Sequence, residues 1–188
     1  MMNIEIIAGS PRVESVSHRL ALYLEKYVSD ITGHSVHLID VRDWNLPVLQ
    51  QHIFSSVEKT PDRFKPLSEH MFEANAFILV TPEFNGSYTP AIKNLFDYFP
   101  KQMHKAFGIA TTSTGAFGGI RATQQLQLLV NALFGIASPQ LLVTPHVDKK
   151  FDSRGNLLDP GFQKNIEAFV TEFLWLAENL TGEMHRVL

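Results

Sequence analysis

The chain has 188 residues, of which 45% are hydrophobic and 19% are charged, and its formal net charge is -3. This length predicts one domain over residues 1–188, and the apolar content excludes wholesale disorder. The absence of cysteine excludes disulfides, thiolate metal sites and a cysteine nucleophile, and the balanced charge gives no basic surface for a nucleic-acid partner.

Short apolar runs alternate with segments of helical period along the chain. The runs cover residues 4–8, 36–39, 77–80, 107–110 and 141–143, and the nearly continuous ones are typical of strands buried on both faces. Apolar stripes of helical spacing lie within residues 20–31, 126–134 and 166–177. Two weaker helices are predicted over residues 66–74 and 90–98, each with a proline in its first turn.

This alternation of strands and helices predicts the α/β class, with a parallel sheet covered by helices on both faces. In open sheets of this kind, ligands bind beyond the carboxyl ends of the strands. We therefore expect the function to depend on the loops that follow Ala8, Val80 and Thr112. The stretches 42–62 and 144–159 are predicted to be long polar loops within the same domain.

The loop after the first predicted strand combines hydroxyl groups and a cation ahead of a helix. Gly9 permits a sharp turn, and Ser10, Arg12, Ser15 and Ser17 follow it. Amides at a helix N-terminus and an arginine fork both bind phosphate oxygens, so this combination indicates a phosphate site. An ordinary helix cap is the competing interpretation for Ser15 or Ser17 taken alone.

Two common nucleotide-binding motifs are absent from the sequence. It contains neither G-x-G-x-x-G nor G-x-x-x-x-G-K-[ST], so neither a dinucleotide-binding Rossmann site nor a P-loop nucleotidase is supported. Asp40, at the end of the second strand, has a suitable position for a ribose contact, but the glycine fingerprint that normally accompanies such an acid is missing.

The loops after the third and fourth strands are rich in glycine and aromatic residues. Glycines allow a flat ligand to lie against the backbone, and Phe84, Tyr88 and Phe117 are candidates to wall it. Ordinary packing is the alternative for each aromatic ring. For the glycines at positions 115, 118 and 119, the alternative is a tight turn into the next helix.

Three motifs follow three different strands in order: Gly9-Ser10-x-Arg12-x-x-Ser15, residues 81–87 followed by Lys93-Asn94, and Gly118-Gly119-x-Arg121-Ala122. Together they resemble the NADPH-dependent FMN reductase family, which includes azoreductases, quinone reductases and chromate reductases. The resemblance extends from the first strand to about Val143. It implies a flavodoxin-like three-layer α/β/α sandwich, with a five-stranded parallel sheet in the order 2-1-3-4-5 and a single FMN-binding domain.

The resemblance also implies roles for the matching residues. Those expected to hold the FMN phosphate are Ser10, Arg12, Ser15 and Ser17. Those expected to lie along or at the edge of the isoalloxazine ring are Pro82, Glu83, Phe84, Asn85, Gly86, Ser113, Gly115, Gly118 and Gly119. The chain departs from the family at Phe84, where the family usually has Tyr, and at Ser17, where it commonly has Asn.

The implied activity is that of an FMN-dependent NAD(P)H oxidoreductase. Hydride would pass from NADPH or NADH to FMN, and electrons would pass on to an acceptor such as a flavin, a quinone, an azo compound or a metal oxyanion. Because the cofactor carries this chemistry, no catalytic side chain is assigned. Two alternatives from other classes are a flavodoxin-like electron carrier, which the modest charge and Arg12 disfavour, and a cofactor-free binding protein.

Two further features each have two interpretations. Arg121 is a candidate to reach the phosphate of the nicotinamide cofactor, with a salt bridge at the start of a helix as the alternative. Trp44, together with Leu46-Pro47, is a candidate lid over the ring, with ordinary loop packing as the alternative.

The family resemblance implies a homodimer or a homotetramer, with the flavin near the subunit interface. Phe96 and Tyr98 in a short predicted helix, with Phe99 directly after it, would suit such a contact. Burial inside one subunit explains these aromatic residues equally well.

No metal site and no membrane segment is expected from the sequence. Of the eight histidines, only His34 and His37 lie close together in the sequence, and no carboxylate cluster joins them. The first residues lack the basic and apolar segments of a signal peptide, and no apolar run approaches the length needed to cross a bilayer. We expect a cytoplasmic protein without a membrane or nucleic-acid partner.

Overall fold

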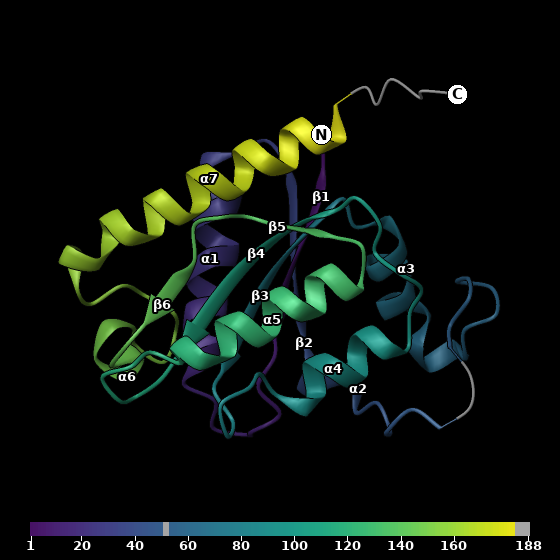
Figure 1. Ribbon diagram of the computed structural model, residues 1–188, viewed down its shortest axis with the longest axis horizontal. Helices are drawn as coiled ribbons and strands as arrows, with labels where there is room; N and C mark the ends of the chain where they lie inside the picture. Colours follow the sequence, from purple (N-terminus) through teal and green to yellow (C-terminus); the bar gives the residue numbers. More distant parts are fainter. Residues whose placement is uncertain (51–52, 183–188) are drawn as a thin grey trace.

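A computed structural model describes residues 1–50 and 53–182 (Figure 1). Every strand and helix predicted from the sequence is present in its expected segment. In chain order the elements are β1 (Asn3–Ala8), α1 (Ser17–Ile31), β2 (Ser35–Asp40), α2 (Val41–Trp44), η1 (Asp62–Phe64), α3 (Lys65–Glu73), β3 (Ala76–Pro82), α4 (Pro90–Asp97), β4 (Ala106–Thr112), α5 (Ile120–Ala132), β5 (Ile136–Ala137), β6 (Leu142–Thr144), α6 (Val147–Lys150), η2 (Pro160–Phe162) and α7 (Gln163–Thr181).

The strands form a parallel sheet in the order β2-β1-β3-β4-β5, as the family resemblance implied. Ile4 on β1 pairs with Val36 on β2 and Ala76 on β3, and Ala76 pairs with Ala106 on β4. Because these strands run in one direction and in close register, their carboxyl ends meet at one edge of the sheet.

Two short strands share the last position of the sheet. β5 pairs with the first half of β4, and β6 pairs with the second half. The sequence predicted only the second of them. Pro139 lies between β5 and β6 and has no amide hydrogen to donate, so a continuous strand is interrupted there.

Helices cover both faces of the sheet (Figure 1). α1 and α7 pack on one face, where Leu24 and Phe169 lie in one core with Ile6 of β1. α3, α4 and α5 pack on the other face, where Phe96 and Phe107 belong to a second core. Across the described residues, no helix has both the length and the apolar character needed to span a bilayer.

Both stretches predicted to be polar loops contain a short helix. α2 begins one residue before the stretch 42–62 and extends into it, and α6 lies within the stretch 144–159. The Asp40 carboxylate caps α2 by accepting a hydrogen bond from the Arg42 amide at 2.9 Å. A helix of one turn is too short to produce a periodic apolar pattern, which is why the sequence analysis missed both.

Phe96, Tyr98 and Phe99 are buried in the core on the α3–α5 side of the sheet. Phe96 packs edge-on against Phe77 at 5.6 Å between ring centres. Internal burial is therefore the correct interpretation of these aromatic residues, and the suggestion that they form a subunit contact is not supported.

Candidate functional site

Loops that follow different strands meet at the carboxyl edge of the sheet. The Gly9 amide donates a 2.8 Å hydrogen bond to the Val80 carbonyl, and the Thr89 hydroxyl donates to the Gly9 carbonyl. The Arg12 guanidinium carbon lies 4.8 Å from the centre of the Phe84 ring. The loop after β1 is thus joined to the end of β3 and to the loop that follows it, as the position of the motifs predicted.

The start of the first loop requires a glycine because of close packing. A Cβ atom at position 9 would lie 2.2 Å from Cδ1 of Ile92 on α4 and 3.1 Å from the Val80 carbonyl oxygen. Real Cβ atoms do not approach other atoms as closely as the first of these distances. Gly9 therefore allows the backbone to turn directly beside α4.

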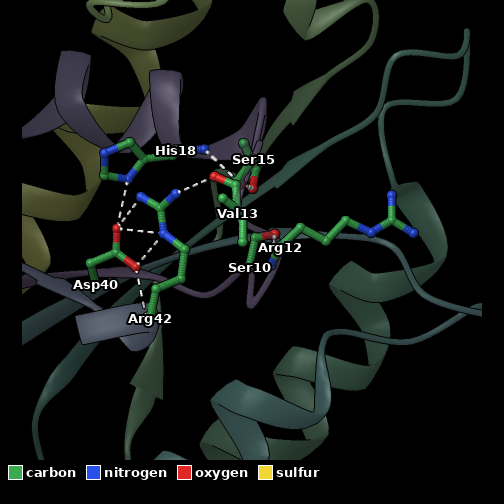
Figure 2. A network of polar contacts seen from close by, with 8 residues as sticks. Ser10, Arg12, Val13, Ser15, His18, Asp40 and Arg42 are labelled. Atoms are coloured by element: carbon green, nitrogen blue, oxygen red, sulfur yellow. Dashed lines mark hydrogen bonds and ion pairs between the residues drawn. The ribbon is translucent and has the colours of Figure 1, made fainter. Parts of the chain in front are cut away.

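The serines of this loop bind one another and the backbone, and Figure 2 shows Ser10 and Ser15 on the loop beside Arg12 and Val13. The Ser10 hydroxyl accepts from the Arg12 amide at 3.4 Å, and the Ser15 and Ser17 hydroxyls lie 2.8 Å apart. The Ser15 hydroxyl also accepts from the His18 amide at 3.3 Å. Val16, not Ser15 or Ser17, occupies the N-cap position of α1, and Ser15 stabilises the helix start from one residue earlier.

The same loop presents donors that suit an anion. Among the described residues, the amides of Val13 and Glu14 donate to no protein acceptor. Arg12 is exposed, and Figure 2 shows its side chain extending away from the Asp40–Arg42 pair. Free amides next to a helix start, with hydroxyl groups and a guanidinium nearby, fit a phosphate group.

Asp40 is engaged by protein groups, so its carboxylate is not free for a ribose. Arg42 Nε donates to both carboxylate oxygens at 2.9 and 3.0 Å, and His18 Nδ1 lies 3.1 Å from Oδ2 (Figure 2). The Arg42 guanidinium also donates to the Val13 carbonyl at 2.9 Å. Through Arg42, Asp40 supports the loop that carries the free amides.

The surroundings lower the pKa of both Asp40 and His18, which leaves the acid charged and the histidine neutral. Burial raises the pKa of Asp40, but the hydrogen bonds and charge of Arg42 outweigh burial and hold that pKa below its ordinary value. Burial lowers the pKa of His18, and the neighbouring Asp40 offsets this only in part. Near neutral pH the network is an Asp40–Arg42 ion pair beside a neutral imidazole.

The loop after β3 makes a tight two-residue turn at Asn85 and Gly86. Their φ angles are 51° and 81°, in the left-handed region that asparagine and glycine tolerate best. Phe84 and Ser87 exchange backbone hydrogen bonds of 2.8 and 3.0 Å across the turn. Within the described part of the chain, the Asn85 and Gly86 amides have no protein acceptor, so they can donate to a ligand at this edge.

Glu83 and Arg121 join the loops after β3 and β4. Arg121 Nε donates to Glu83 Oε1 at 2.6 Å, and its backbone amide donates to Oε2 at 3.1 Å. Because α5 begins at Ile120, this is an ion pair at the start of a helix, and that interpretation of Arg121 is confirmed.

The glycines after β4 make the turn into α5. Gly118 and Gly119 have φ angles of 60° and 80°, and a Cβ at position 118 would lie 2.7 Å from the Pro145 nitrogen. Ser113 accepts from the Gly115 amide at 2.9 Å. Phe117 is 81% exposed, so its ring is little covered by the described residues.

A pocket of about 490 Å³ lies between the loop after β1, the segment around α2 and α4. Trp44 and Leu46 belong to its lining. The Asn94 side-chain amide donates to the Leu46 and Pro47 carbonyls at 3.3 and 2.8 Å, which fixes this segment against α4. Packing of the loop accounts for Leu46 and Pro47, and Trp44 borders the pocket.

Two residues that support the site, Thr89 and Arg42, were not predicted from the sequence. Thr89 is fully buried, and its hydroxyl binds the Gly9 carbonyl and caps α4. The Thr89-Pro90 pair is a helix-start signal that pointed to this cap. No local signal indicates that Arg42 reaches Val13, because the two residues are 29 positions apart in the chain.

Comparison with known proteins finds similarity over most of the chain. A family model described as NADPH-dependent FMN reductase matches residues 2–148. The FMN-dependent NADPH-azoreductases of Staphylococcus aureus (strain USA300) and Staphylococcus haemolyticus (strain JCSC1435) are each 30% identical to this chain over 183 residues. These alignments cover 93% of this chain and 94% of each relative.

Solved structures agree on the fold. FerB, a flavoenzyme NAD(P)H:(acceptor) oxidoreductase from Paracoccus denitrificans, matches with a TM-score of 0.77 at 22% identity, over 95% of this chain and 98% of FerB. A flavodoxin variant from Pseudomonas aeruginosa matches with a TM-score of 0.58 at 17% identity, over 94% of this chain and 99% of the flavodoxin. Both matches confirm the flavodoxin-like fold.

Proposed function

Because this chain belongs to the NADPH-dependent FMN reductase family and is an FMN-dependent oxidoreductase that uses NADPH, we propose that it reduces a small-molecule acceptor. Bound FMN supplies the hydride and electron chemistry, and the protein supplies binding, orientation and electrostatics. The azoreductase relatives favour an azo compound as acceptor, with quinones, flavins and metal oxyanions as further classes. They do not favour the electron-carrier or cofactor-free alternatives.

We assign the FMN phosphate to the loop after β1. Ser10, Arg12, Ser15 and Ser17 are its proposed ligands, together with the backbone amides between them. The observation that carries the proposal is the pair of free amides at Val13 and Glu14, next to a guanidinium and ahead of α1. These donors match the charge and the hydrogen-bonding needs of a phosphate monoester.

The flat ring is assigned to the loops after β3 and β4. The proposed contacts are Pro82, Glu83, Phe84, Asn85, Gly86, Ser113, Gly115, Gly118 and Gly119. Support comes from the turn at Asn85 and Gly86, whose amides are free to donate to an electron-rich ring edge. Glu83 holds Arg121, so we assign it to positioning the two loops rather than to direct contact through its carboxylate.

FMN binding and reduction test the proposal directly. FMN-mixed protein is passed through gel filtration and then reduced anaerobically with NADPH while the visible flavin band is followed. We expect the flavin to co-elute and the band to bleach. Flavin that co-elutes but is bleached by neither NADPH nor NADH would support the electron-carrier class, and loss of the flavin would contradict the assigned site.

A matched pair of arginine variants tests the phosphate assignment. Arg12→Ala removes a charge-assisted contact, so the Kd for FMN should rise about 10- to 100-fold. Arg154→Ala is the control, because the Arg154 side chain is 84% exposed and pairs with Asp152, which is not an assigned ligand. Equal FMN affinities for the two variants would remove Arg12 from the site.

We further propose a cytoplasmic homodimer or homotetramer. Exposed apolar side chains at Phe117, Ile120 and Leu128 lie on and before α5 and provide a surface for association. Light scattering of the FMN-loaded protein tests the assembly, and a monomer would contradict it. Cell fractionation tests the location.

A further inference from the structure

A glutamate and two histidines form a cluster on the α3 side of the sheet, away from its carboxyl edge. Glu5 lies on β1 and pairs in register with His37 on β2, and His70 approaches from α3. Glu5 precedes Gly9 by four residues, or about 13 Å along an extended strand. The cluster is therefore separate from the loops assigned to FMN.

The three side chains present their ligand atoms to one another. Glu5 Oε1 lies 3.2 Å from His37 Nδ1 and 3.0 Å from His70 Nδ1. One ligand atom from each residue falls within 4.8 Å of the other two. A tetrahedral zinc ion with bonds of about 2.0–2.2 Å holds its ligand atoms about 3.3–3.5 Å apart, so this spacing needs little adjustment.

The glutamate is buried while the histidines face solvent. Glu5 is 1% exposed, and its Oε2 atom has no hydrogen-bond partner among the described residues. A buried carboxylate is costly unless it is paired or coordinates a metal. The side chains of His37 and His70 are 41% and 37% exposed, which gives an ion a route from solvent.

A neighbouring hydroxyl supports the required tautomer of His37. Nε2 of this ring lies 3.3 Å from the Ser35 hydroxyl. An Nε2 proton donated to Ser35 leaves the Nδ1 lone pair facing Glu5. Metal-binding histidines commonly have such a partner on the second ring nitrogen, which fixes the orientation of the ring.

The charged groups around the cluster also favour a cation. Two further carboxylates belong to the surroundings: Glu73 interacts electrostatically with Glu5, and Glu25 interacts electrostatically with His37. Lys105 is the opposing charge near Glu5. Its ammonium donates to the Gln102 side chain at 2.8 Å, so it has an acceptor of its own.

We propose that Glu5, His37 and His70 form a zinc site whose fourth position is open to water. The ion would join β1, β2 and α3, because His37 and His70 lie 32 and 65 positions after Glu5 in the chain. Because both imidazoles and the carboxylate must be deprotonated to bind, zinc binding releases protons and weakens on acidification. The role is to stabilise the fold, independently of FMN chemistry.

Zinc titration of the FMN-loaded, chelator-treated protein tests the site. Calorimetry should show one tight equivalent of zinc, and zinc at about 100 times Kd should raise Tm by about 5–10 °C. His70→Gln and Glu5→Gln should each weaken binding at least about 10-fold. His104→Asn is the matched control, because His104 is exposed, has a φ of 61° that asparagine tolerates, and lies outside the cluster.

Two outcomes would overturn the proposal: no zinc binding by the wild-type protein, or binding that His70→Gln leaves unchanged. Circular dichroism checks that each variant is folded. If Glu5→Gln does not fold, zinc binding by His70→Gln, a change at a half-exposed position, decides whether the cluster is the site. FMN content and NADPH oxidation are measured on the same samples. Their loss would count against the proposed function, whereas zinc binding reports on the cluster.

Discussion

The contact between Gly9 and Ile92 can be tested with a double-mutant cycle. In Gly9→Ala, the new Cβ would lie 2.2 Å from Cδ1 and 2.4 Å from Cγ1 of Ile92, so the side chain or the loop must move. Overpacking of this kind costs about 1–3 kcal/mol of the free energy of unfolding.

The second arm of the cycle removes the obstructing atoms. Ile92→Ala deletes both of them from a fully buried position on α4, at a cost of about 2–5 kcal/mol. In the double variant, the methyl group introduced at position 9 would enter the space that Ile92 vacates. Its destabilisation should therefore fall short of the sum of the single variants by about 1–3 kcal/mol, the size of the relieved overpacking.

Urea unfolding of the four proteins at one pH measures this coupling, and FMN titration shows whether the shifted loop binds the cofactor less tightly. Gly33→Ala is the control glycine, because a Cβ there would meet no atom within 4 Å. Its stability should stay equal or rise by about 0.4–1 kcal/mol, through the lower entropy of the unfolded chain.

Additive destabilisation within about 0.5 kcal/mol, the usual scatter for independent sites, would refute the contact between position 9 and Ile92. Additivity would mean that Ile92 does not set the limit at position 9. A Gly9→Ala variant as stable as the wild-type protein would lead to the same conclusion.

Three further predictions concern the supports of the site. Asp40→Asn should destabilise the protein most at neutral pH, because Arg42 holds the pKa of Asp40 below its unfolded value of about 4. The difference in the free energy of unfolding between wild type and variant should shrink as acid protonates the native carboxylate, which unfolding measured across pH would show. Thr89→Val leaves the buried Gly9 carbonyl without its donor and should cost about 1–3 kcal/mol, with weaker FMN binding in a fluorescence titration. Gly118→Ala meets both a positive φ and a backbone contact at 2.7 Å, so thermal unfolding should show a lower Tm; an unchanged Tm would argue against the turn as described.

Much of the sheet could be predicted from the sequence because its central strands are continuous apolar runs. Residues such as Ile78 and Phe107 lie on strands covered on both faces, and that burial leaves a direct compositional signal. The two-residue β5 and the four-residue α2 leave no comparable signal. They depend on pairing with β4 and on the cap from Asp40.

The candidate site also has parts that the sequence could predict and parts that it could not. Its loops could be located because they come directly after buried strands, and the turn at Asn85 and Gly86 has a recognisable local chemistry. The groups that hold those loops, such as Arg42, act through contacts that only the folded chain creates. The cluster of Glu5, His37 and His70 escaped for that reason, since spacing in the sequence separated residues that β1, β2 and α3 bring together.

The division of the last strand into β5 and β6 has a consequence for how copies of this chain can associate. A long, flat sheet edge is a template on which another chain can add a strand, and proteins avoid this with short edge strands and proline. Here the edge beside β4 consists of segments of two and three residues with Pro139 between them. Growth of the sheet from one subunit into the next is disfavoured at this edge, so an assembly should form through helical surfaces, and partly unfolded chains have less opportunity to aggregate by pairing strands.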